Sequence, residues 1–344
     1  MELRPLNLED ENVLQEYGSF TEKHLFHSLK WLRFIAGSYN YACEICEIRE
    51  GDRRIGYFPF VTARKGPFRV LGSPIQGTGT SYMGPVFTAY PEMQEKEFVE
   101  LLEGHFRIYS YNELAFDDPG VEQSLLPYLK GIGFEAEEKT TLILRIEFDE
   151  KNMWAGLKSG CKQAIKKAEN SGLRIVYEKD PGWVDKFLSA CGQVFSKRGY
   201  SSPYTKEVLE NMWSSLYPDN LCVASAYSKD NEYMAGAIFT YSSAKAYFWA
   251  GASFPEYNRF GPNNFIHWNF IRSLIEKKIP YYDLYGANIA EYPSIARFKQ
   301  SFGAEFSTYY KFCRSNTVLV RAARELYKQY ALVRRKGFRA LYRE

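Results

Sequence analysis

A lysine between two phenylalanines and an aspartate in an apolar strand are the residues of this sequence best suited to chemistry. Lys299 lies in the run Phe298-Lys-Gln-Ser-Phe302, and Asp283 lies in Tyr281-Tyr-Asp-Leu-Tyr-Gly286. The flanking rings would partly desolvate the Lys299 ammonium, so its charge would act more strongly on a developing negative charge. Asp283 could accept a proton from an amine, orient a substrate, or cap a neighbouring loop. Acyl transfer to an amine needs charge stabilisation and proton removal, and it needs no protein nucleophile.

No nucleophile constellation competes with this chemistry. The sequence contains no Gly-x-Ser-x-Gly elbow, and no motif pairs any of its four histidines with a cysteine. His267 falls on the apolar arc of a predicted helix, which favours a packed core histidine. Cys43 and Cys46 lack two further ligands at zinc spacing, so the sequence predicts no metal site.

The candidate residues depend on a predicted strand–helix–strand unit. The aromatic run Ala246 to Ala252 predicts a strand, a loop follows up to Pro262, and a helix is expected from Asn263 to Lys278. The second strand covers 281–286. Two strands joined by a crossover helix pair in parallel. The loop leads into the helix N-terminus, where free N–H groups favour an anion or an oxyanion.

These motifs together resemble the FemABX family. A proline precedes an aromatic-containing helix, Tyr-Asp-Leu-x-Gly follows at 282–286, and Phe-Lys-x-x-Phe-Gly follows at 298–303. The resemblance implies two fused GNAT-type acyltransferase domains. It also implies transfer of an aminoacyl group from aminoacyl-tRNA to an amine of a peptidoglycan precursor, with Lys299 stabilising developing charge at the active site. Lys299 and Asp283 are therefore the predicted catalytic pair.

Residues near these motifs are predicted to bind substrate. Tyr257, Arg259 and Asn263 surround the helix start, and Arg259 with Gly261 resembles a reduced form of the GNAT pyrophosphate signature, Arg-x-x-Gly-x-Gly. This departure from the signature favours aminoacyl-tRNA over acetyl-CoA. Three further residues complete the predicted substrate contacts. The family resemblance implies Lys30 and Tyr82, and Phe298 is included because it directly precedes Lys299.

A lysine-rich helix is expected from Trp154 to Asn170, where FemABX proteins also place a basic helix. Its lysines leave two interpretations open. They form a solvated face, or Lys158, Lys162 and Lys166 contact the phosphates of tRNA, of a lipid carrier or of a cofactor.

Length and composition predict two domains. The chain has 344 residues and 45% hydrophobic residues, enough for two well-filled cores. The expected fold class is α/β (α+β), with mixed central sheets flanked by helices. We expect a first GNAT-like domain on the acceptor side (1–150), a second for the acyl donor and catalysis (151–320), and a basic C-terminal helix (321–344). The glycine-rich stretch 66–90 is expected to be an irregular loop or the wall of a substrate channel.

The charge is concentrated at the C-terminus. A net charge of +3 is too small for a nucleic-acid-binding surface over the whole molecule, yet residues 321–344 hold eight basic residues against two acidic ones. This segment could bind anionic lipid, bind tRNA or cap the domain. No apolar run approaches the roughly 20 residues of a spanning helix, and the first residues are not a signal peptide. We expect a cytoplasmic protein that visits the inner face of the membrane through this tail.

The sequence thus predicts a FemABX-like aminoacyltransferase. Its partners would be aminoacyl-tRNA, as co-substrate rather than cofactor, and a peptidoglycan precursor or another amine acceptor. Two alternatives remain open. One is an acyl-CoA-dependent N-acyltransferase acting on an amino sugar or a small metabolite, and the other is a catalytically inactive binding module with the GNAT fold.

Overall fold

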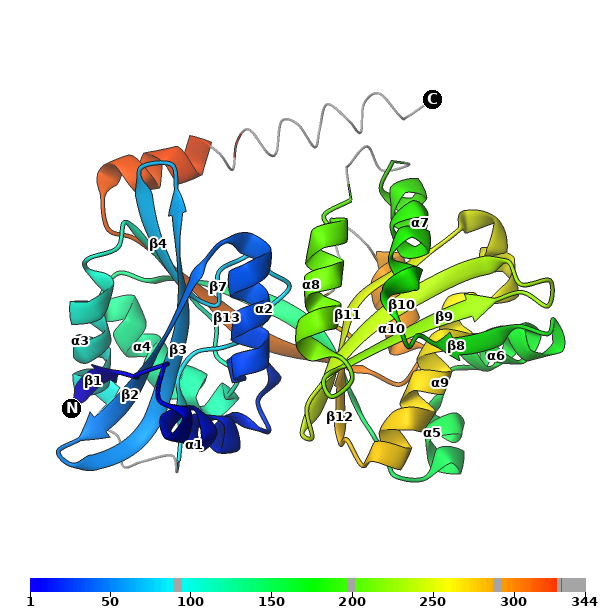
Figure 1. The fold of residues 1–344 in the computed structure, drawn as a ribbon, viewed down its shortest axis with the longest axis horizontal. Coiled ribbons are helices and arrows are strands. Elements are labelled where there is room, and N and C mark those ends of the chain that lie inside the picture. The colour runs from blue at the N-terminus through cyan, green and yellow to red at the C-terminus, as the bar shows by residue number, and fades with distance from the viewer. Residues whose placement is uncertain (89–94, 197–201, 287–292, 327–328, 330–344) are drawn as a thin grey trace. The chain divides into compact units, whose positions relative to one another are not determined.

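A computed structural model describes the chain except for residues 89–94, 197–201, 287–292, 327–328 and 330–344 (Figure 1). The chain forms two compact units. Unit 1 comprises Met1–Phe20, Ile35–Lys139 and Tyr309–Glu344, and unit 2 comprises Thr21–Phe34 and Thr140–Thr308. The segments 21–34 and 309–320 thus lie in the other unit from the one that a linear division near residue 150 assigns to them.

Unit 1 contains a mixed sheet in the order β1-β2-β3-β4-β6-β13, with β5 paired to β3. Strands β4 and β6 are parallel, and the other neighbours are antiparallel. The strands are β1 (Glu2–Pro5), β2 (Ala42–Glu50), β3 (Arg53–Lys65), β4 (Phe68–Ser73), β5 (Val86–Phe87), β6 (Tyr111–Leu114) and β13 (Glu305–Ser315). The helices are α1 (Glu11–Thr21), α3 (Glu95–Phe106) and α4 (Pro119–Gly131), while α2 (Leu29–Tyr39) begins in unit 2 and ends in unit 1.

In unit 2 the strands of the sheet follow the order β7-β12-β11-β10-β9-β8 and are likewise of mixed direction. Only β11 and β12 are parallel among its described strand pairs. The strands are β7 (Glu135–Arg145), β8 (Arg174–Tyr177), β9 (Leu221–Tyr227), β10 (Tyr233–Tyr241), β11 (Lys245–Ser253) and β12 (Tyr281–Asp283). The α-helices are α5 (Glu150–Gly156), α6 (Ser159–Asn170), α7 (Val184–Ser196), α8 (Lys206–Leu216), α9 (Pro262–Lys277) and α10 (Pro293–Gln300). Short 3-10 helices are η1 (Leu25–His27), η2 (Pro181–Trp183) and η3 (Pro255–Phe260).

The same arrangement of elements occurs twice. Unit 1 contains the parallel crossover β4-α3-β6, and unit 2 contains the parallel crossover β11-α9-β12. Each crossover is followed by one helix and one long strand. Strand β7 begins in unit 1 and pairs with β12, whereas β13 begins in unit 2 and pairs with β6. This duplication has no counterpart that we recognise in the sequence, because buried apolar positions can be filled by many residue combinations.

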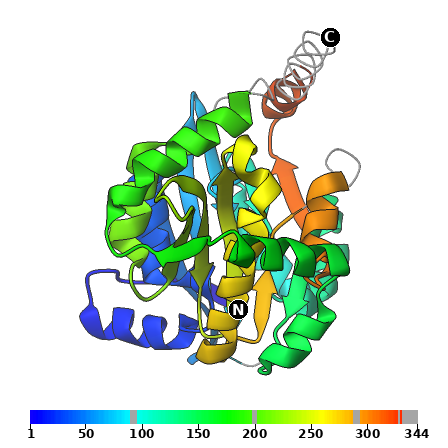
Figure 2. The same cartoon turned by 90° about the vertical axis from the view of Figure 1, so that its right-hand side faces the viewer.

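The predicted strand–helix–strand unit is confirmed. Strand β11 pairs in parallel with β12, from Lys245 opposite Tyr281 to Tyr247 opposite Asp283. Helix α9 packs against the sheet of unit 2, and Figure 2 shows it in yellow in front of the strands. Its apolar arc, including Ile266, Phe270 and Ile271, is buried in the core of this unit. The 3.6-residue periodicity therefore predicted the buried face correctly.

Three sequence predictions are wrong in detail. The expected loop before Pro262 contains a six-residue 3-10 helix, η3, in which Tyr257 and Gly261 donate N–H bonds to residues three positions earlier. The expected single helix 154–170 is broken into α5 and α6, because Leu157 and Lys158 have extended backbones and Leu157 is buried. The stretch 66–90 begins as strand β4, since Val70 and Leu71 are buried between β3 and β6.

The basic C-terminal segment is described only in part. Residues 318–326 are helical, as predicted, and most of 327–344 lies outside the described residues. Among the described helices, none is both long and apolar enough to cross a bilayer.

Candidate active site

The carboxylate of Asp283 organises the turn after strand β12. Its side chain is fully buried, and its Oδ1 accepts hydrogen bonds from Thr141 Oγ1 (2.6 Å) and from the backbone N–H of Tyr285 (2.8 Å). Tyr285 has a left-handed backbone, with φ of 63°. A carboxylate that accepts the N–H two residues later stabilises such a turn. Asp283 therefore fixes the path of the chain where it leaves the sheet.

Lys299 binds the same turn from helix α10. Its side chain is only 5% exposed, and its Nζ donates to the carbonyl oxygens of Tyr285 (3.0 Å) and Gly286 (2.9 Å). Burial lowers the pKa of Lys299 to about 8, and the negative charge of Asp283 opposes this lowering. A buried lysine with a pKa this close to neutrality is typical of functional sites. The structure thus brings the two predicted catalytic residues to one turn.

An aromatic cluster adjoins Lys299. Phe298 is half-buried, and its ring centroid lies 5.3 Å from that of His267 and 5.2 Å from that of Phe302. His267 is buried, and its Nδ1 lies 2.8 Å from the hydroxyl of Tyr282. Burial, and then the nearby charge of Lys299, lower the pKa of His267 to about 3. His267 is consequently neutral at physiological pH, and the prediction of a packed core histidine is confirmed.

The start of helix α9 holds a separate set of contacts. Asn263 Nδ2 donates to Ser253 Oγ (3.0 Å), which in turn donates to Asn258 Oδ1 (2.8 Å). Tyr257 donates its hydroxyl to Glu232 (3.1 Å), and the guanidinium of Arg259 lies over the Phe260 ring. Within the described part of the chain, no hydrogen bond joins this set to Lys299.

Strand β11 extends beyond its partner β12. The two strands pair over three residues at the start of β11, so among the described residues β12 leaves 248–253 unpaired on that side. Open backbone N–H groups next to a strand end can bind an extended ligand or stabilise a developing oxyanion. The arrangement can therefore hold an acyl group between the end of β12, Lys299 and the second half of β11.

Comparison with known proteins agrees with this geometry. Residues 156–300 match the family model described as an acetyltransferase (GNAT) domain, a range that includes α9, β12 and Lys299. This range, less than half of the chain, is therefore similar to a GNAT acetyltransferase domain. A search among curated proteins found no match.

Solved structures extend the likeness to both units. The structure of FemX is similar with a TM-score of 0.69 and 14% identity, covering 86% of this chain and 95% of that one. The structure of L-PGS from Bacillus licheniformis is similar with a TM-score of 0.55 and 12% identity, covering 91% of this chain and 94% of that one. A tandem GNAT protein from the clavulanic acid biosynthesis pathway is similar with a TM-score of 0.54 and 10% identity, covering 92% of this chain and 98% of that one. The fold of the chain is FemABX-like, with two GNAT-type halves.

The remaining predicted substrate contacts are far from Lys299 in the sequence. Lys30 belongs to unit 2, is half exposed, and forms an ion pair with Asp219 (2.5 Å). Tyr82 belongs to unit 1, where its buried ring lies 4.7 Å, centroid to centroid, from that of Tyr309. These two predictions stay untested as substrate contacts.

The lysines of α6 lie at its start and along its surface. Lys158 directly precedes the helix, and its backbone N–H donates to Ser301 O (2.9 Å), one turn after the start of the Phe-Lys motif. Lys162 donates to Ala155 O (2.9 Å), while the side chain of Lys166 is exposed. Two of the three lysines are therefore exposed and available to phosphates.

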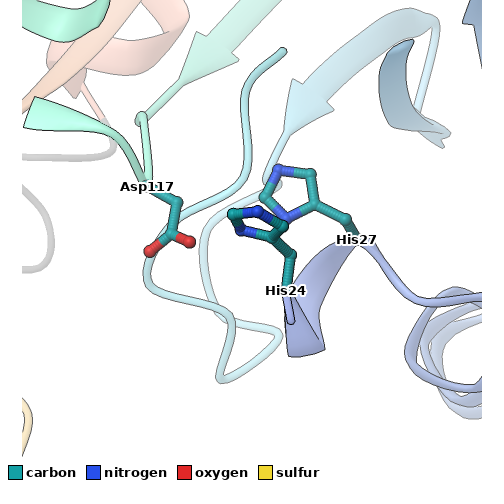
Figure 3. A group of neighbouring side chains, drawn as sticks. All are labelled: His24, His27 and Asp117. Carbon is teal, nitrogen blue, oxygen red and sulfur yellow. The ribbon is translucent and has the colours of Figure 1, made fainter. Parts of the chain in front are cut away.

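Sequence reasoning missed several residues that shape this site. The predicted site residues do not include Thr141, which donates to Asp283, or Tyr282, whose hydroxyl contacts His267. His24 and His27 also form a close pair at η1, with ring centroids 5.4 Å apart (Figure 3). Pairings of this kind depend on sheet register and turns, which a single sequence does not fix.

Proposed function

We propose that this chain is a FemABX-like aminoacyltransferase. It would transfer an aminoacyl group from aminoacyl-tRNA to an amine of a peptidoglycan precursor. The observation that carries the proposal is the buried Lys299, held against two turn carbonyls beside Asp283. The FemABX-like fold and the GNAT domain support it.

In the proposed reaction the acceptor amine attacks the ester carbonyl of aminoacyl-tRNA. A C–N bond forms, the C–O bond to the ribose breaks, and the proton lost by the amine ends on the ribose oxygen. The ammonium of Lys299 stabilises the negative charge that develops on the carbonyl oxygen, because a cation with low solvent exposure acts strongly there. Asp283 acts as a positioning residue, since its Oδ1 is occupied by two hydrogen bonds and its side chain is buried.

The tRNA would lie near α6, whose exposed Lys158 and Lys166 can neutralise phosphates. Lys30, Tyr82 and Phe298 are proposed to contact the acceptor or the transferred group. These substrates place the reaction in the cytoplasm.

The test is a transfer assay with mixed aminoacyl-tRNA, labelled in the amino acid, and a nucleotide-linked muropeptide as acceptor. Lys299→Met should lower the rate at least about 100-fold, because one charge stabilising an oxyanion contributes about 3 kcal/mol. Arg297→Gln is the matched control, since Arg297 is exposed on the same helix, and it should keep the wild-type rate. Full activity of Lys299→Met, with an unchanged melting temperature, would exclude the proposed role.

A second candidate is an acyl-CoA-dependent N-acyltransferase. The open second half of β11 and the match to an acetyltransferase domain favour it. Against it, Pro262 removes one N–H from the first turn of α9, where a pyrophosphate would need donors. Coenzyme A at about 100 times its dissociation constant would stabilise such an enzyme by about 2.7 kcal/mol, whereas a tRNA-dependent enzyme should show no shift in melting temperature.

A further inference from the structure

One end of unit 1 combines exposed aliphatic side chains with a concentration of basic residues. Three segments form this end face: the β3–β4 hairpin tip (64–69), the turn 106–110 and the helical segment 318–326. They contain six basic residues and a single acid, Glu325, although the whole chain has a net charge of only +3. The basic residues are Arg64, Lys65, Arg69, Arg107, Arg321 and Arg324.

Hydrogen bonds tie the three segments together through Ser110. Its N–H donates to the carbonyl of Arg69 (2.8 Å), its hydroxyl accepts from the N–H of Arg69 (3.2 Å), and its carbonyl accepts from the N–H of Asn316 (3.0 Å). The side chain of Asn316 also donates to Phe106 O (2.8 Å) and Tyr109 O (2.7 Å). The end face is therefore built from parts of unit 1 with a fixed relative placement. Figures 1 and 2 both show the hairpin tip and the orange-red helix at the same end of this unit.

The helical segment 318–326 turns its apolar side outward. Val320 is buried, and Arg324 donates to Ser315 Oγ (2.9 Å) and lies over the Tyr111 ring, so one side of the segment faces unit 1. On the opposite side of the helix, three aliphatic side chains are at least two-thirds exposed. They are Val318 (83%), Leu319 (68%) and Leu326 (67%).

The exposed aliphatic residues extend to the neighbouring turn. Ile108 is 59% exposed, and it follows Arg107, whose exposed guanidinium also pairs with Glu103 (3.2 Å). The hairpin tip adds Arg64 and Lys65, which are both exposed. Exposed aliphatic groups surrounded by basic residues are characteristic of proteins that lie on a membrane surface.

We propose that this end face docks onto the surface of an anionic membrane. The aliphatic side chains would enter the boundary between head groups and acyl chains, and the basic residues would contact acidic head groups. Charge complementarity selects this partner over a second copy of the chain, because two copies of so basic a surface would repel each other. The exposed Val318, Leu319 and Leu326 select it over a nucleic acid, since phosphate binding gives aliphatic groups no role. The sequence 327–344 adds six basic residues and one acid, so the same charge continues along the chain.

The test is cosedimentation of the full chain with vesicles of phosphatidylcholine, alone or with 30 mol% phosphatidylglycerol. The wild type should bind the mixed vesicles, and 0.5 M salt should weaken this binding because it screens the head-group charges. The double variant Arg64→Glu/Lys65→Glu should bind at least about tenfold more weakly. The double variant Val318→Ser/Leu319→Ser should also bind more weakly. The wild type should keep some vesicle binding in 0.5 M salt through its aliphatic side chains, and this variant should lose it.

The matched control is Lys179→Glu/Lys229→Glu, which makes the same change in charge at exposed lysines of unit 2. It should bind like the wild type. Equal binding to neutral vesicles, or equal loss in the control, would overturn the proposal. Dimerisation abolished by Val318→Ser/Leu319→Ser would identify a second copy as the partner instead. If the protein binds tRNA but not vesicles, and this binding depends on Arg64 and Lys65, the partner of the end face is a nucleic acid.

Discussion

Thr141 and Asp283 share a hydrogen bond of 2.6 Å inside unit 2, where neither side chain is more than 2% exposed. The bond joins two neighbouring strands, because Asp283 in β12 pairs with Ile143 in β7, two residues from Thr141. A carboxylate held in this way keeps its charge near Lys299 and has no contact with bulk solvent. Its effect on the reaction should therefore appear through the pKa of Lys299.

Asp283→Asn should shift the alkaline limit of activity to lower pH. The pKa of Lys299 is about 8, and the charge of Asp283 raises it against the effect of burial. If the protonated lysine is the active form, activity falls as pH rises through this value, and removing the carboxylate charge moves the fall to lower pH. The pH dependence of kcat/KM, which reports the groups of the free enzyme, measures this shift.

Thr141→Val is the matched control for this substitution. It removes one hydrogen bond to Asp283 and keeps the charge, so the alkaline limit should stay near pH 8. The protein should lose about 1–2 kcal/mol of stability, because the buried carboxylate loses a donor. An unchanged limit in Asp283→Asn would show that this charge does not act on the lysine.

Gly261→Ala should destabilise the protein by about 1–3 kcal/mol, measured by urea unfolding. Gly261 precedes α9 with φ of 71°, and an added Cβ would lie 2.6 Å from the carbonyl oxygen of Ala164 in α6. Both the backbone conformation and the close approach of α6 therefore require glycine.

Gly192→Ala provides the opposite case. Gly192 lies within α7, and an added Cβ would meet no atom within 4 Å. The substitution should stabilise the protein by about 0.5–1 kcal/mol, through the higher helix propensity of alanine. Equal effects at the two glycines would contradict the argument from φ and packing.

His267 should make the protein less stable in acid. Its pKa is lowered to about 3 in the folded protein, whereas an unfolded histidine titrates near 6.5. Between these values the unfolded chain binds the additional proton, so stability falls as pH decreases from about 6.5. The slope should be up to about 1.4 kcal/mol per pH unit steeper in the wild type than in His267→Gln. Urea unfolding at pH 6 and pH 4.5 measures it, and equal slopes would show that His267 is not buried in its neutral form.

The sequence predicted the parts of this fold that depend on local periodicity. The apolar arc of α9, the parallel pair β11–β12 and the burial of His267 followed from the order and spacing of residues, and all three are confirmed. At the start of α2, Ser28 Oγ accepts the backbone N–H of Trp31, an N-cap contact that also depends only on nearby residues. Short-range signals of this kind are encoded by neighbouring residues.

Other features depend on residues far apart in the chain. Thr141 reaches Asp283 across 142 positions because the register of β7 and β12 brings them together. Lys299 reaches the carbonyls of Tyr285 and Gly286 because α10 packs against the turn after β12. The break between α5 and α6 accompanies burial of Leu157, and the local signal for it is Gly156, the last residue of α5, since glycine has a low helix propensity. The motif resemblance singles out Lys299, whereas its hydrogen-bond partners, the carbonyls of Tyr285 and Gly286, are known only from the structure.

Glu122→Gln should stabilise the protein above neutral pH. Glu122 is a buried residue of α4 in unit 1, and its Oε2 accepts the backbone N–H of Tyr310 in β13 (2.8 Å). Burial raises its pKa from the ordinary value to about 7, and the hydrogen bond from Tyr310 opposes this effect. The folded protein thus favours the protonated acid, and stability falls as pH rises from about 4.5 through 7. Glutamine keeps an acceptor for Tyr310 and has no charge to bury. The free energy of unfolding of the variant should therefore rise by about 1–3 kcal/mol at pH 8 and change little at pH 4.5.

Urea unfolding at the two pH values measures the difference. Glu100→Gln, exposed on α3, is the control, and its free energy of unfolding should change by less than about 0.5 kcal/mol. A gain of equal size at both pH values would mean that the charge of Glu122 costs the folded state nothing.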